Sequence, residues 1–72
     1  MIAIDLVKGK FSITCHPNEA GAIRRIPGIK WSSASRAWSV QPSRLAKAVL
    51  RDDIARRPGV HVTGAAEDEL AR

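Results

Sequence analysis

The pair Pro27-Gly28 constrains the fold more than any other feature of this 72-residue chain. The proline ring removes a backbone hydrogen-bond donor and disfavours a helical conformation at Ile26, while Gly28 can adopt the positive φ of a type II turn. A helix must therefore end before this pair. The residues after it can begin a strand.

Both tryptophans lie in two short alternating segments after this turn. A hairpin that pairs Trp31 with Trp38 also pairs Ile29 with Val40, and it places these four side chains on one face. A shift by two residues would pair Trp31 with Arg36 and would keep the same face. The alternation therefore predicts the faces of this hairpin and leaves two registers open.

Cations gather around the turn and the hairpin. Four Lys or Arg residues fall within 13 positions, and no acid lies between Glu19 and Asp52. The loop that joins the two strands is rich in hydroxyl groups, which suits a phosphate-binding tip. Trp38 is expected in the core, whereas Trp31, beside the loop, is a candidate for either a core or a ligand contact. The predicted nucleic-acid-binding residues are Arg24, Arg25, Lys30, Trp31, Ser32, Ser33, Ser35 and Arg36.

A family resemblance rests on this region. The residues that carry it are Arg25-Ile26-Pro27-Gly28-Ile29-Lys30-Trp31 and Arg36-Ala37-Trp38-Ser39-Val40. The pattern resembles the HARP-like accessory domain, which lies N-terminal to the motor in Swi/Snf-type annealing helicases and in phage superfamily-two helicases. The resemblance covers roughly residues 11–50 and involves no catalytic signature. It implies a DNA-binding module that works with a helicase motor domain, in the same chain or in another. Such domains often have an acidic residue where this chain has Ser32.

The start of the chain is predicted to form a second hairpin from alternating apolar segments at residues 2–7 and 11–16. A two-residue loop at Lys8-Gly9 places all the alternating apolar side chains on one face. A three-residue loop would put Asp5 opposite Ile13 and split that set. The two-residue loop is therefore favoured.

Two helices complete the predicted fold, one over residues 17–25 and one that begins at Pro42 and Ser43. The apolar stripe of the second helix consists of Leu45, Ala46, Val49, Leu50 and Ile54. The expected fold is a small α+β unit in the order strand, strand, helix, strand, strand, helix, with an antiparallel sheet covered on one face by the helices. This unit occupies residues 1–63, and residues 60–63 could add a short edge strand. Residues 64–72 are expected to be an acidic linker or a frayed C-terminal segment of helix.

The charge distribution narrows the choice of partners. Residues 1–63 hold 11 of the 12 Lys and Arg residues but only four of the seven acids. Such an excess favours phosphate backbones or acidic lipid surfaces. The chain has no run of about 18 apolar residues and no secretory signal, and its single cysteine suits a reducing compartment. A cytoplasmic protein that does not interact with membranes is expected.

A metal site or a Cys-His nucleophile pair is suggested only by Cys15, His16 and His61. Adjacent residues in a strand point to opposite faces, and no further ligands complete a tetrahedral site. The chain also has no glycine-rich phosphate loop and no Walker motif. No metal, no cofactor and no catalysis by this chain alone are therefore expected.

The sequence favours a DNA-binding accessory domain that grips backbone phosphates by shape, because no helix presents side chains arranged to read base edges. Whether it prefers duplex, fork or single strand stays open. The main alternative is a small interaction protein, for example phage-encoded, that binds a host protein through the Trp31 hairpin or a sheet edge. A single-stranded RNA binder would need exposed aromatic residues on its sheet, and two of the three aromatic residues are assigned to the core.

Overall fold

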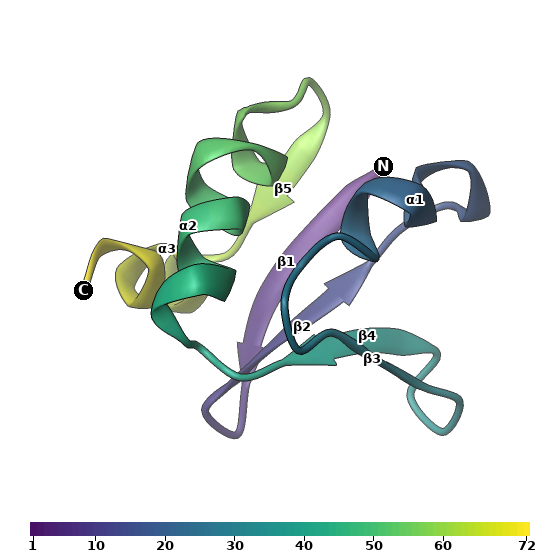
Figure 1. The fold of residues 1–72 in the computed structure, drawn as a ribbon, viewed down its shortest axis with the longest axis horizontal. Coiled ribbons are helices and arrows are strands. Elements are labelled where there is room, and N and C mark those ends of the chain that lie inside the picture. The colour runs from purple at the N-terminus through teal and green to yellow at the C-terminus, as the bar shows by residue number, and fades with distance from the viewer.

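The chain folds around one five-stranded sheet with the strand order β3-β4-β2-β1-β5 (Figure 1). The computed structural model describes all residues 1–72. The strands are β1 (Ile2–Val7), β2 (Lys10–Thr14), β3 (Lys30–Ser32), β4 (Ala37–Val40) and β5 (Val60–Val62). The helices are α1 (Ala20–Ile23), α2 (Arg44–Asp52) and α3 (Gly64–Ala71), with 3₁₀ turns η1 (Pro17–Glu19) and η2 (Ile54–Arg56). None of these helices has the length and apolar character needed to cross a membrane.

The hairpin β1–β2 has the predicted two-residue loop. Lys8 and Gly9 have φ angles of 52° and 78°, as expected for the two central residues of a type I′ turn. In the resulting register Ile4 pairs with Ile13, and Leu6 pairs with Phe11. The prediction for this hairpin is confirmed.

The sheet is mixed, because β5 pairs with β1 in parallel through Ile2–Val60 and Ile4–Val62. The predicted α+β class is confirmed, but the expectation of an antiparallel sheet is wrong at this strand. The reason lies in the connection from β4. Because α2 and η2 carry the chain back over one face of the sheet to its far edge, β5 runs in the same direction as β1.

The core lies between the helices and one face of the sheet. Its largest fully buried side chains come from β1 and β2 on the sheet side and from α1, α2, η2 and the turn after α1 on the other side; they are Ile4, Phe11, Ile13, Ile23, Ile26, Leu50 and Ile54. Ser43 caps α2, since its Oγ accepts a hydrogen bond of 3.1 Å from the Ala46 N–H. Leu45, expected on the apolar stripe of this helix, is instead exposed.

The last nine residues correct a second prediction. Of the two forms expected, the linker is wrong and the helix is correct, because Gly64–Ala71 forms α3, but this helix is docked on the core and not frayed. Ala66 and Leu70, one helical turn apart, are both buried in the core. Thr63 is the N-cap residue of this helix, and its Oγ1 accepts a hydrogen bond of 3.3 Å from the Ala66 N–H. Two polar contacts with α2 also hold α3 in place, the Lys47–Glu69 ion pair and a 3.3 Å hydrogen bond from Arg51 Nη1 to the carbonyl oxygen of Leu70.

Candidate nucleic-acid interface

The turn that orients the β3–β4 hairpin is the predicted type II turn. Gly28 has a φ of 81°, and the Ile29 N–H donates a 3.2 Å hydrogen bond to the carbonyl oxygen of Ile26. Ile26 is buried in the core. The turn is therefore anchored at its first residue, which fixes the direction in which β3 leaves it.

The register of the hairpin is the one that pairs the two tryptophans. Trp31 lies opposite Trp38, and Lys30 lies opposite Ser39. Trp38 also pairs with Ile13 of β2, which is fully buried under the helices. Because paired residues share a face, both tryptophans are on the helix side of the sheet, and Lys30 is on the open side.

The two indoles differ in burial. Trp38 is half-buried and packs against the core, so its predicted core position is only partly correct. Trp31 is 53% exposed. The ring centroids are 5.2 Å apart with an interplanar angle of 63°, which is an edge-to-face contact. Trp31 is therefore held in place by its neighbour while much of its own surface faces solvent.

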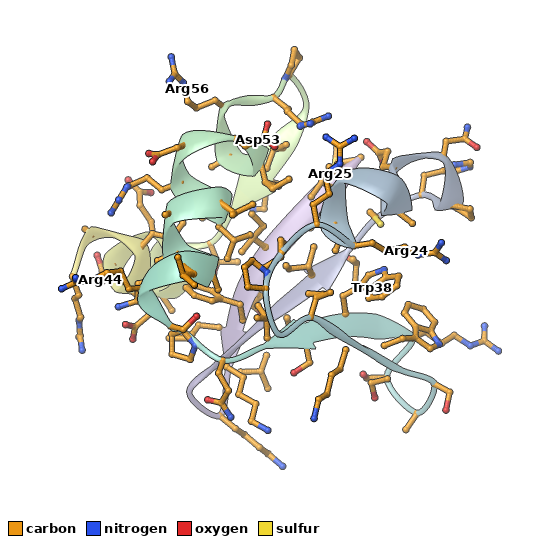
Figure 2. All side chains as sticks on the ribbon, in the orientation of Figure 1. Arg24, Arg25, Trp38, Arg44, Asp53 and Arg56 are labelled. Carbon is orange, nitrogen blue, oxygen red and sulfur yellow. The ribbon has the colours of Figure 1, made fainter.

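Arg24 lies beside this pair. It ends α1 as the C-cap residue, and its Cζ is 5.8 Å from the centre of the Trp38 ring, within the range of a cation–π interaction. Figure 2 shows Arg24 extending alongside Trp38, while Arg25 points away from it. Of these two neighbouring arginines, only Arg24 therefore lies beside the tryptophans.

An open hollow of about 380 Å³ lies between α1 and the tryptophans. Its lining residues come from five different elements or their ends, and they are Cys15, Pro17, Ala20, Arg24, Trp31 and Trp38. None of these is acidic. The first three were not predicted as site residues. The spacing of Pro17, Ala20 and Arg24, which suits one side of a helix, was a signal that could have indicated their common surface.

The helical segment that forms one wall of the hollow is shorter than predicted and is capped at its start. It consists of η1 and one turn of α1. The Asn18 N–H donates a 3.3 Å hydrogen bond to Nδ1 of His16, and the His16 N–H donates one of 3.1 Å to Oε1 of Glu19. These reciprocal bonds form a capping box. They fix the position of the wall relative to the sheet.

Cys15 is half-buried at the edge of the hollow. Burial, together with the nearby Glu19 carboxylate, raises the pKa of the Cys15 thiol above its ordinary value of about 9.0. The thiol is therefore protonated at neutral pH and is a poor nucleophile. No three His, Cys, Asp or Glu residues come together in an arrangement that could hold a metal ion.

The other predicted residues lie on the loop and on the open side of the sheet. Ser32 and Ser35 line a second open hollow, also of about 380 Å³, together with Lys8, Lys10 and Ser12. Ser33 and Arg36 are exposed in the loop, and Arg36 has a φ of 52°. The predicted residues thus surround the β3–β4 hairpin on both faces instead of forming one flat patch.

The charges of the site are unpaired. The ion pairs of the protein join the N-terminus to Glu19, Lys47 to Glu69, Arg51 to Asp52 and Arg57 to Asp53. Three of the four therefore lie on the segment from α2 to α3. Arg24, Arg25, Lys30 and Arg36 are all exposed and take part in none of them.

No protein-family model, no curated protein and no solved structure matches this chain.

Proposed function

We propose that the protein is a DNA-binding accessory domain that grips the phosphate backbone around the β3–β4 hairpin by shape instead of by base sequence. One observation carries this proposal. The hairpin patch, defined as Arg24, Lys30, Trp31 and Arg36, combines three exposed cations that meet no acid with an exposed indole. Cations that have no protein partner can replace the counterions of DNA at little cost.

The resemblance to HARP-like accessory domains supports a place for this module beside a helicase motor. In that arrangement the hairpin patch holds DNA while the motor, in the same chain or in another, supplies the ATP-driven movement. Phosphate contacts position a protein on DNA without selecting a base. Binding is therefore expected to be similar for unrelated sequences.

The test compares single charge-removing variants in the patch with a matched control outside it. Arg24→Gln, Lys30→Gln and Arg36→Gln should each weaken binding to unrelated DNA sequences alike. Each should also reduce the slope of log affinity against log salt by about one unit, since one phosphate contact is lost. The measurement is a fluorescence-anisotropy titration at several salt concentrations.

Arg56→Gln is the control, because it removes the same charge from an exposed residue on η2 that forms no ion pair. Figure 2 shows Arg56 far from the end of the molecule that carries Trp38. Arg25→Gln should resemble this control, since Arg25 points away from the hairpin patch (Figure 2). Equal losses in all variants would show only general electrostatic attraction and would contradict the proposal.

A second candidate function is favoured by the exposed outer edge of β3. A three-residue edge strand that carries an exposed tryptophan could accept a strand from a protein partner. Salt separates the two candidates, because an apolar contact is far less sensitive to salt than counterion release. If the parent protein binds no DNA at low salt, the protein-partner function is the better explanation.

A further inference from the structure

The hollow beside Trp31 points to a more specific ligand than a phosphate backbone. We infer that it takes one unpaired base of single-stranded DNA, stacked on the Trp31 indole. This inference rests on the proposed DNA binding and adds to it the preferred strand form. The shape of the hollow and the residues that line it support the inference.

Trp31 is both exposed and fixed. About half of its surface faces solvent, yet its ring is braced by the edge-to-face contact with Trp38 at 5.2 Å. An aromatic platform that is already held in position loses little conformational entropy when a ligand binds. A half-exposed indole braced in this way is suited to stacking against a flat, apolar ring.

The size and chemistry of the hollow also suit a base. Its volume of about 380 Å³ lies at the lower end of the range of about 300–1,000 Å³ that is typical of small-ligand sites. Pro17 and Ala20 provide short apolar walls opposite the indoles. This volume and these walls suit one planar base.

Arg24 is placed to hold the phosphate of such a nucleotide. It lines the same hollow as Trp31, and its guanidinium is already placed over the Trp38 ring at 5.8 Å. A base that enters the hollow brings its own phosphate to the rim, and a fixed guanidinium is a strong partner for phosphate oxygens. No acid lines the hollow to repel that phosphate.

These features favour a single strand over a duplex. In a duplex both faces of each base are covered by neighbouring base pairs. An indole can therefore stack on a base only after that base has left the duplex stack. A single strand offers unstacked bases without the cost of breaking a base pair. Because every base has a π-face, the hollow should accept all four bases.

The experiment uses three DNA ligands of equal length: oligothymidylate, an oligomer with the same phosphates but abasic sugars, and a duplex. The parent protein should bind oligothymidylate more tightly than the abasic oligomer by about 5-fold to 150-fold, which corresponds to the stacking of one base. The salt slopes for the two single strands should be equal. For the duplex, the binding free energy per phosphate contacted should be no larger than for the abasic oligomer, because its bases are not available for stacking.

Three variants test whether the hollow is responsible. Trp31→Ala should abolish the preference for oligothymidylate over the abasic oligomer, and Trp31→Phe should keep part of it. Ala20→Leu keeps Trp31 but narrows the hollow opposite it by three carbon atoms, so it should also reduce the preference while affinity for the abasic oligomer is unchanged. Circular dichroism of each variant confirms that it is folded before binding is measured.

The outcomes separate this inference from the proposed function. If the parent binds both single strands equally, or if Trp31→Ala and Ala20→Leu keep the preference for bases, the inference is wrong while phosphate binding stands. If the parent binds none of the three ligands at low salt, both the proposed function and the inference are wrong. A base preference lost in Trp31→Ala and reduced in Ala20→Leu supports the inference.

Discussion

The two edge strands of the sheet, β3 and β5, are reached through local sequences that share an isoleucine, an arginine and a Pro-Gly pair at the same spacing. Residues 23–31 read Ile-Arg-Arg-Ile-Pro-Gly-Ile-Lys-Trp, and residues 54–62 read Ile-Ala-Arg-Arg-Pro-Gly-Val-His-Val. In both segments the first isoleucine is fully buried, and the glycine has a positive φ, 81° in one and 78° in the other. In both, a short helical turn leads through Pro-Gly into a three-residue strand.

The segments after these two strands are different. After β5, Thr63 caps α3, and this helix buries Leu70 against the core. Before β5, one of the two neighbouring arginines is also paired, since Arg57 lies 3.2 Å from Asp53. After β3 comes a polar loop, and Trp31 and the nearby Arg24 have no helix over them and no acidic partner.

This difference shows that the same helix–turn–strand unit can lead either into a helix docked on the core or into an exposed hairpin. The unit fixes the path of the chain through its buried isoleucine and its glycine. The segments after the two strands then differ: a helix that packs against β1 and α2 follows β5, and an exposed polar loop follows β3. On this basis the β5 edge should matter for stability alone, whereas the β3 edge should matter for binding as well.

The largest expected effect tests the structural side of the comparison. Leu70→Ala should lower the free energy of unfolding by about 2–5 kcal/mol, because the side chain is only 6% exposed and its removal leaves a cavity. The DNA affinity of the folded fraction should not change. Urea unfolding and a DNA titration under folding conditions measure the two quantities.

A leucine on the neighbouring helix provides the control for this prediction. Leu45 of α2 is 65% exposed, so Leu45→Ala should change stability by less than about 0.5 kcal/mol. If Leu70→Ala were as mild as Leu45→Ala, α3 would contribute nothing to the core, and the contrast between the two edges would be lost.

The sequence was sufficient to predict the β1–β2 hairpin with its loop, the turn before β3 and the faces of the β3–β4 hairpin, but it left the register of that second hairpin open. Strict alternation defined the faces and the loop at Lys8-Gly9, and Pro27-Gly28 defined the turn before β3. These are local properties, and each depends on a few neighbouring residues. The parallel pairing of β5 was missed because it depends on the path of α2 across the sheet, which no local pattern specifies.

The role of α3 and the form of the candidate site were harder to predict for the same reason. Only Ala66 and Leu70 of α3 are buried, so the acid-rich segment 64–72 has little apolar periodicity. For Trp31 the alternation gave the correct face but could not show that α1 is too short to cover it. The hollow also depends on Pro17, whose nearness to the tryptophans arises only in three dimensions.

A smaller effect tests whether the two turns are equivalent. Gly28→Ala and Gly59→Ala should each cost about 1–2 kcal/mol in stability, because both place a Cβ at a positive φ. Steric contact does not distinguish them. A Cβ at Gly28 would lie 3.8 Å from Cγ2 of Val40, an ordinary van der Waals contact, and one at Gly59 would have no neighbour within 4 Å.

The two variants should differ only in binding. Gly28→Ala disturbs the turn that orients the β3–β4 hairpin, so it should weaken DNA binding measured under conditions where both variants are folded. Gly59→Ala should bind like the parent protein. Equal binding by both would mean that the orientation of the hairpin is unimportant for the proposed function.

The smallest effect concerns pH and the ion pair that joins α2 to α3, the helix after β5. Nζ of Lys47 lies 2.9 Å from Oε2 of Glu69, and this contact lowers the pKa of Glu69 below its ordinary value of about 4.5. A carboxyl group with a lowered pKa in the folded protein stabilises the fold at pH values above the unfolded pKa. That stabilisation is lost as the pH falls through the lowered pKa.

Thermal unfolding between pH 3 and pH 7 should therefore show a decline in stability that begins near pH 4.5. Glu69→Gln should make this decline shallower without removing it, because the pKa of Glu19 is also lowered, by its hydrogen bond to the N-terminal amino group. Glu67→Gln is the control, since Glu67 is exposed on the same helix and forms no ion pair. The hairpin patch contains no carboxylate, so Glu69→Gln should leave DNA affinity at neutral pH unchanged. If Glu69→Gln kept the full acid sensitivity of the parent, the Lys47–Glu69 pair would not contribute to the decline. If Glu69→Gln bound DNA differently, α3 and the β3 edge would not be independent.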